Sequence, residues 1–180
     1  MSLHTRFLCL AVVLLTLSGA IRADNKAVID SNTADALGRL LEHAGGADKL
    51  LGSAAGVLVF PDVVKMGFGE GGQYGEGALL VDNQPVAYYA TAGSSFGLGL
   101  GVQYKAQVIL FMTEDALAQF RNTQGWEVGT HGEVPLLKPG VGGKIDFASV
   151  SEPVVGMIFS DQGLSYNLSL EGNRFVRIAR

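Results

Sequence analysis

Cysteine is almost absent from this 180-residue chain, which contains only Cys9. That residue lies inside an apolar N-terminal stretch that we expect to be removed, so the remaining chain has no thiol. Disulfide bonds, thiol catalysis and thiolate metal sites are therefore excluded. Histidine is scarce as well: only His43 and His131 follow this stretch, and neither belongs to an H-x-x-x-H pattern. We expect no metal ion and no cofactor.

Charged side chains are also few, at 17% of the chain, and 17 acidic residues face 13 basic ones. Loss of Arg6 and Arg22 with the N-terminal stretch leaves a net charge of about −6. Nucleic-acid-binding surfaces need clustered Lys and Arg to contact phosphates. We therefore expect no nucleic-acid partner.

The first 23 residues have the order of a secretory signal peptide. Arg6 precedes an apolar run over residues 7–17, and small residues follow, including Ser18, Ala20 and Ala23. The run is shorter than the roughly 20 apolar residues that span a bilayer, which disfavours a membrane anchor. We expect cleavage after Ala20 or Ala23, a single domain over residues 24–180, and a periplasmic or secreted protein.

Two helices are expected. Thr113 is a good N-cap for a short helix over residues 114–121, whose apolar side carries Leu117 and Phe120. A longer amphipathic helix is predicted over residues 24–51, with an end or kink at Gly45-Gly46. Its apolar side has three- and four-residue spacing and consists of Ile29, Thr33, Ala36, Leu37, Leu40 and Ala44.

Short apolar, β-branched runs separated by glycine predict strands at residues 57–60, 78–81, 86–90, 108–112, 154–159 and 164–170. The last run alternates most regularly, and we expect it to pair with residues 154–159 through a turn at residues 160–163. Residues 125–143 are expected to form a loop with one short strand. The predicted fold class is α+β: a curved, mainly antiparallel, glycine-rich sheet, open or barrel-like, covered by the N-terminal helix and one shorter helix.

Glycine is abundant in this chain, which contains 25 glycine residues, and several alternate with other residues in its middle. Glycines two residues apart in an extended chain leave one face without side chains. Such a face indicates either a sharply curved sheet with close packing, which we favour, or a ligand groove. The alternating glycines form a weak 30-residue repeat: Gly67, Gly69 and Gly71, then Gly97, Gly99 and Gly101.

One motif raises an enzyme hypothesis. Residues 93–97 match G-x-S-x-G, and Ser95, Asp115 and His131 follow the chain order of a serine hydrolase. That motif needs a helix directly after the serine, whereas a glycine-rich strand is expected here. We predict a protein that is not an enzyme and keep a hydrolase using Ser95 as a remote alternative.

The chain resembles the SYLF domain over about residues 37–178. The resemblance rests on residues 59–61 leading to Gly71-Gly72, on residues 75–77, on the Gly97-x-Gly-x-Gly101 run, and on residues 163–164 followed by 169–172. It implies non-enzymatic binding of phospholipid, with a basic amphipathic N-terminal helix contributing in eukaryotic members. Yeast members also regulate and bundle actin, and bacterial members are largely envelope proteins. A leader of bacterial type disfavours a role with actin.

The function expected on this basis is binding of phospholipid or another amphiphile, or of a membrane surface, in the bacterial envelope. The alternative is a structural or partner-binding envelope protein without a small ligand. Because residues 24–51 carry a net charge of −2, the helix either inserts weakly and independently of salt or only covers the sheet. A basic patch in the fold could instead use Lys65, Lys105, Lys138 and Lys144. The candidate lipid-binding residues are Ile29, Leu37, Leu40, Lys65, Gly69, Gly71, Gly99 and Gly101.

The leader generates a first testable prediction. N-terminal sequencing of the protein isolated from its native source should begin at Ile21 or Asp24, because small residues precede both positions. A membrane-extracted protein that still begins at Met1 would contradict it.

Overall fold

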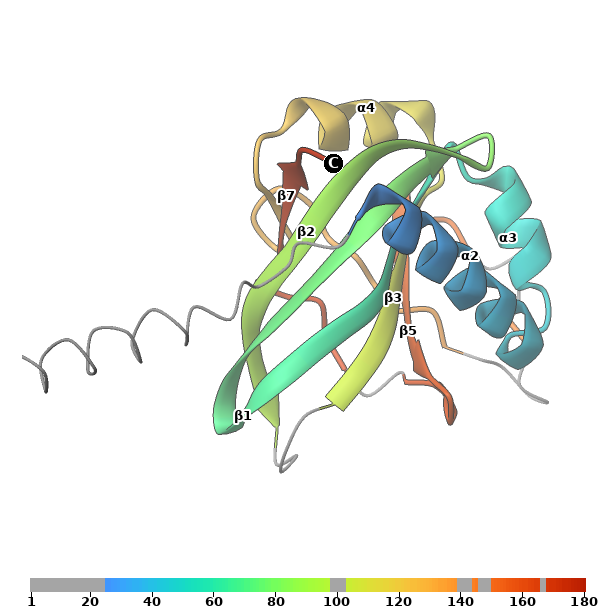
Figure 1. The fold of residues 1–180 in the computed structure, drawn as a ribbon. Helices are drawn as coiled ribbons and strands as arrows, with labels where there is room; N and C mark the ends of the chain where they lie inside the picture. The colour runs from blue at the N-terminus through green and yellow to red at the C-terminus, as the bar shows by residue number, and fades with distance from the viewer. Residues whose placement is uncertain (1–24, 98–102, 139–143, 146–149, 166–167) are drawn as a thin grey trace, which may run out of the picture.

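The structure is a computed structural model that describes residues 25–97, 103–138, 144–145, 150–165 and 168–180. In these residues the strands form one antiparallel sheet in the order β4-β7-β2-β1-β3-β5-β6, with β4 and β6 at its two open ends. The α+β class with a curved sheet is thus confirmed, and the sheet is open rather than barrel-like (Figure 1). In chain order the elements are α2 (Lys26–His43), α3 (Ala47–Ser53), β1 (Gly56–Val81), β2 (Gln84–Gly97), β3 (Gln103–Phe111), α4 (Glu114–Asn122), β4 (Trp126–Glu127), β5 (Val154–Ser160), β6 (Gly163–Leu164) and β7 (Arg174–Ile178).

The helices lie where the sequence predicts them. The Asn25 side chain caps α2 by accepting a hydrogen bond from the Ala27 N–H, and Thr113 caps α4 through the Ala116 N–H, both at 3.2 Å. The break between α2 and α3 falls at Gly46, whose φ of 91° is left-handed and favours glycine. The buried side of α2 comprises Ile29, Thr33, Ala36 and Leu40.

Strand β1 contains two of the predicted strands and folds back on itself (Figure 1). Its first arm, residues 56–65, pairs with β3, and its second arm, residues 69–81, pairs with β2. The arms lie side by side: a Cβ atom on Gly75 would come within 2.8 Å of the Asp62 carbonyl oxygen, and one on Gly77 would overlap the Val59 carbonyl. Close backbone approach therefore occurs at Gly75 and Gly77, which are not among the alternating glycines of the predicted repeat.

The predicted strand over residues 164–170 is wrong in its extent. The turn at residues 160–163 and the pairing with β5 are confirmed, but β6 ends at Leu164, and residues 168–170 are not extended in the sheet. The side chain of Leu170 is fully buried and lies near Gly156 and Val134 in the core. Leu170 is not paired in a β ladder, so the chain has left the sheet at this point. Leu168, two residues earlier, is exposed, so the apolar alternation does not correspond to one buried face here.

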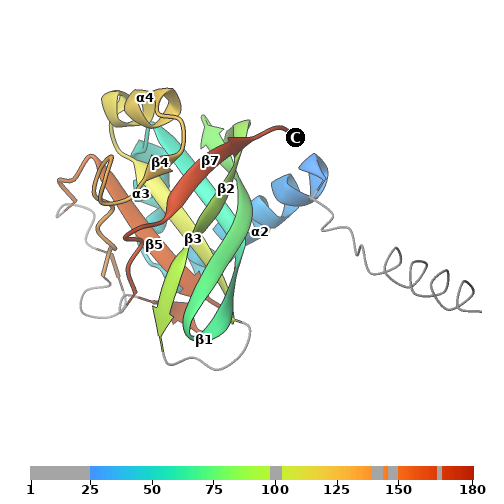
Figure 2. The same ribbon diagram turned by 90° about the vertical axis from the view of Figure 1, so that its left-hand side faces the viewer.

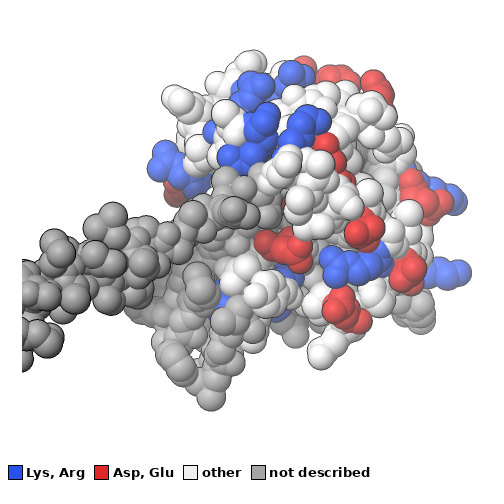
Figure 3. Space-filling model, viewed as in Figure 1, with Lys and Arg blue, Asp and Glu red and all other residues white. Residues whose placement is uncertain are grey.

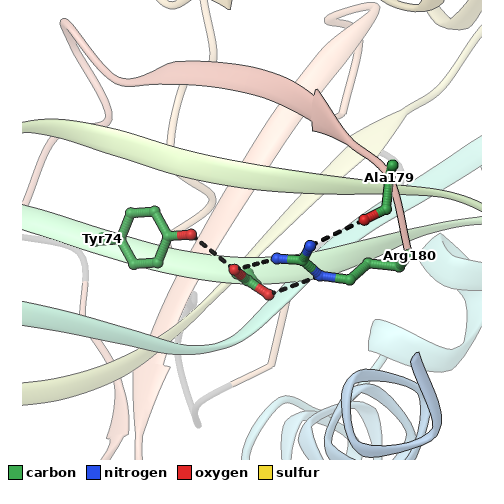
Figure 4. A network of polar contacts seen from close by, with 4 residues as sticks. Tyr74, Ala179 and Arg180 are labelled. Atoms are coloured by element: carbon green, nitrogen blue, oxygen red, sulfur yellow. Dashed lines mark hydrogen bonds and ion pairs between the residues drawn. The ribbon is translucent and has the colours of Figure 1, made fainter. Parts of the chain in front are cut away.

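Strand β7 was not predicted, because a five-residue strand with one fully buried side chain, Phe175, gives little periodic signal. It pairs with β2 on one side and with β4 on the other. The short β4 confirms the single strand expected within residues 125–143. An ion pair joins the end of the chain to β1: the Arg180 guanidinium binds Glu76, which also accepts a hydrogen bond from the Tyr74 hydroxyl at 2.7 Å (Figure 4).

Each face of the sheet carries its own core. One core lies beneath α2 and α3 and includes Leu40, Leu50 and Val108. The opposite core lies beneath α4 and the residues 126–136 loop, and its centre is aromatic (Figure 2). There the Trp126 and Phe175 rings stack with centroids 5.9 Å apart. Helix α2 therefore covers the opposite face from the one that carries the cavities described below.

The folded-back strand generates a prediction for stability. Gly77→Ala should destabilise the fold by about 1 to 3 kcal/mol, since the added methyl group overlaps the Val59 carbonyl of the other arm. Gly72→Ala is the matched control in the same strand, because nothing lies within 4 Å of a Cβ there. Urea titrations that give equal free energies of unfolding for the two variants would show that the arms separate freely.

Candidate functional site

A cavity of 490 Å³ lies on the sheet face opposite α2, where the glycine-rich ends of the strands leave the aromatic core. We call it the cationic cavity, because two lysines line it. Strands β1, β2, β3 and β5 and the segment of residues 168–171 form its walls. The lining residues are Val63, Lys65, Gln73, Ser94, Gln103, Lys105, Gln107, Ile158, Leu168, Ser169 and Glu171.

Strand pairing explains why the two lysines meet. Lys65 pairs with Gln103, and Val63 pairs with Lys105, so the lysines lie diagonally across neighbouring strands. Along β3 the same face runs from buried Ile109 through Gln107 to Lys105, which changes it from apolar to polar. Burial, with a smaller contribution from the charge of Lys65, lowers the pKa of Lys105. The cavity therefore concentrates positive charge that an anionic ligand group would neutralise.

The floor of the cationic cavity contains a polar group without a protein partner. Gln107 lines the cavity and is only 3% exposed, and its Oε1 has no hydrogen-bond partner. More than nine in ten buried polar groups in proteins are paired, so an unpaired group beside a cavity indicates a place for water or ligand. Gln73, another lining residue, already donates a 2.5 Å hydrogen bond to Oδ1 of the fully buried Asn173.

A second cavity of 630 Å³ lies next to the first, and we call it the apolar cavity. The two cavities share Leu168, Ser169 and Glu171, which form the wall between them. Apart from this wall, the lining is mainly aliphatic, with charged residues among it. It comprises Val128, Glu133, Val134, Pro135, Leu136, Lys138, Glu152, Pro153 and Val154.

The shared wall is held in place by local contacts. Ser169 Oγ accepts a hydrogen bond from the Glu171 N–H at 3.0 Å, and Leu170 is anchored in the core. The Glu171 carboxylate lies against Gly129, where any side chain would overlap it and where a φ of 87° also favours glycine. This carboxylate is therefore positioned at the junction of the two cavities.

The structure separates the predicted site residues into three groups. Lys65 lines the cationic cavity, while Gly69 and Gly71 pair with Gly97 and Ser95 in the β1–β2 ladder. Ile29 and Leu40 are buried against the sheet, and Leu37 packs against the same core, so α2 covers the sheet in this structure. Gly99 and Gly101 lie outside the described residues.

Of the basic patch considered from sequence, Lys65 and Lys105 share one cavity and Lys138 lines the other. Lys144 lies elsewhere, in a bridge with Gly45 beside α2. Sequence reasoning missed Gln107 and the cavity role of residues 168–171. Gln107 interrupts an otherwise apolar run in β3, which was the available signal, whereas the wall depends on a loop path that no periodicity encodes.

The hydrolase motif lies in a different context from the one it requires. Ser95 is within β2, which continues as a strand to Gly97, so no helix follows the serine directly. His131 Nδ1 accepts a hydrogen bond from the Glu127 N–H at 3.0 Å. Asp115 is in the first turn of α4. In the part of the chain that the structure describes, no cluster of three or more His, Asp or Glu side chains could hold a metal ion.

Comparison with known proteins finds no matching family model and no matching curated protein sequence. The resemblance to the SYLF domain therefore stays a prediction from the motifs.

The lysine pair generates a prediction with a defined sign. Since the pKa of Lys105 is lowered from 10.5, the unfolded chain binds this proton more tightly, and the charge destabilises the folded state at neutral pH. Lys105→Met should raise the melting temperature at pH 7, and its advantage should shrink as the pH rises toward 10.5.

Lys49→Met, on the exposed side of α3, is the matched control and should leave the melting temperature nearly unchanged at both pH values. A lower melting temperature for Lys105→Met would show that this lysine stabilises the fold through a contact instead.

Proposed function

We propose that this protein binds a phospholipid or another amphiphile in the cell envelope and catalyses no reaction. The observation that carries the proposal is the pair of adjacent cavities, one mainly aliphatic and one with two lysines and an unpaired polar group. An amphiphile has the same division between an apolar part and a polar part. Pockets of this size, between about 300 and 1,000 Å³, are typical of small-molecule sites.

The two ends of such a ligand would be stabilised by different forces. Transfer of a chain into the apolar cavity removes it from water and contributes about 25 cal/mol per Å² of apolar surface. An anionic head group would relieve the repulsion between Lys65 and Lys105, and a hydroxyl group of the ligand would donate a hydrogen bond to Gln107 Oε1. The apolar cavity alone would also bind a hydrocarbon, and the two lysines alone would also bind a small anion. Both cavities together are needed to select an amphiphile.

Helix α2 is a weaker candidate for the lipid contact. Its exposed large apolar side chains are Val28 and Leu41, at 44% and 47% exposure, because Ile29 and Leu40 point into the core. Acidic side chains are scattered over the part of this face where α2 and α3 lie (Figure 3). Lys26 is engaged by Asp30 at 3.2 Å, which leaves less basic charge for anionic lipid.

The envelope location rests on the predicted leader, which lies outside the described residues. Among the described residues, no helix is long and apolar enough to cross a membrane. A partner-binding role without a small ligand is the second candidate, and one observation favours it. Tyr74 and Val176 are exposed on the face that carries α2, beside the Glu76–Arg180 ion pair.

The test compares lipid binding by two variants, one with a substitution in the wall shared by the cavities and one with a substitution on α2. Leu168→Asp should abolish binding of a fluorescent phosphatidylglycerol analogue, because it places a charge between the two cavities. Leu41→Asp should leave binding intact, because this side chain lies on the exposed side of α2. Both residues are exposed, so both variants should fold with an unchanged melting temperature.

Binding by neither the original protein nor the variants would contradict the proposed function and favour the partner-binding role. Loss of binding in Leu41→Asp alone would instead identify α2 as the lipid contact. Mass spectrometry of solvent extracts from the natively purified protein supplies an independent measurement, in which copurified lipid is expected.

A further inference from the structure

We propose that the ligand is a glycerophospholipid with one acyl chain: its chain fills the apolar cavity, its phosphate lies at Lys65 and Lys105, and its free glycerol hydroxyl donates to Glu171. This inference rests on the proposed function and specifies the ligand of the same site. Three observations lead to it.

The apolar cavity has room for an acyl chain. Its volume of 630 Å³ lies in the range of small-molecule sites, and aliphatic side chains and prolines line much of it. A chain that enters this cavity leaves water and gains the stabilisation of burial.

The size and chemistry of the cationic cavity match a phosphate with an attached polyol. Its volume of 490 Å³ is more than the carboxylate of a fatty acid needs. Lys65 and Lys105 supply charge-assisted donors for phosphate oxygens. Gln107 offers an amide to the polyol from the floor of the cavity, where its Oε1 has no protein partner.

The junction distinguishes one chain from two. Glu171 presents an exposed carboxylate on the wall shared by both cavities, close to where the glycerol carbons of a ligand that spans them would lie. A lipid with one acyl chain has a free hydroxyl on these carbons, and a carboxylate accepts a hydrogen bond from it. In a lipid with two chains this hydroxyl is esterified and has no proton to donate. Sites that hydrogen-bond a ligand hydroxyl discriminate strongly against analogues that lack it.

The experiment measures displacement of a fluorescent monoacyl phosphatidylglycerol from the delipidated full chain. The competitors are palmitoyl lysophosphatidylglycerol, dipalmitoyl phosphatidylglycerol in vesicles, palmitate and sn-glycerol 3-phosphate. The monoacyl lipid should compete at least about tenfold better than each of the others, a factor that corresponds to about 1.4 kcal/mol. Glycerol phosphate without a chain tests whether a free polyol phosphate is the source of the recognised group.

Each alternative result has one meaning. Equal or stronger competition by the diacyl lipid overturns the single-chain inference and leaves the proposed function standing. Equal competition by palmitate overturns the head-group assignment, and equal competition by glycerol phosphate overturns the role of the chain. Failure of the labelled monoacyl lipid to bind overturns the inference, and the proposed function is overturned as well only if the phosphatidylglycerol analogue of the preceding test also fails to bind.

A variant tests the hydroxyl contact directly. Glu171→Gln should weaken binding of the monoacyl phosphatidylglycerol about tenfold, because the neutral amide oxygen accepts a weaker hydrogen bond than the carboxylate does, and should leave palmitate binding unchanged. Glu114→Gln, at the start of α4 and outside both cavities, is the matched control. An equal loss for palmitate, or no loss for the monoacyl lipid, overturns the contact with Glu171.

Discussion

The close approach of the two arms of β1 is the constraint on which the rest of the sheet depends. Gly75 and Gly77 allow backbone carbonyls of residues 59–62 to lie where side chains would otherwise stand. The first arm then pairs with β3 and the second with β2, so one segment supplies the centre of the sheet. Both cavities lie on the face of this sheet away from α2.

The two faces of the sheet have consequently taken different roles. Burial of Ile29 and Leu40 against β1 and β3 uses the apolar side of α2 for stability, and the Tyr88 hydroxyl adds a 2.7 Å hydrogen bond to Asp30. The opposite face has an aromatic core at one end and polar groups at the other. There, the partly buried Lys105 and the unpaired Gln107 amide oxygen lower the stability of the folded state. Destabilising polar groups of this kind are common in ligand-binding sites.

Much of the fold could be predicted from local patterns. Helix caps at Asn25 and Thr113, the break at Gly46 and the apolar runs of β1, β3 and β5 depend on neighbouring residues, so they can be recognised in sequence. The site was predicted less well. Of its charged residues, Lys65, Lys105 and Lys138 were considered, but only as a general basic patch. The alternation over residues 164–170 predicted a strand of seven residues, but β6 ends at Leu164, and of the later leucines Leu168 is exposed while Leu170 is buried.

The sequence by itself determined the helices, most of the strands and the α+β class, because these follow from periodicity and capping. Only the tertiary structure decided which face of the sheet α2 covers and which side chains meet across it. Lys65 and Lys105 are 40 positions apart, and Glu171 lies 66 further on. Their meeting depends on strand register and on the path of a loop, and neither is written in the residues adjacent to them.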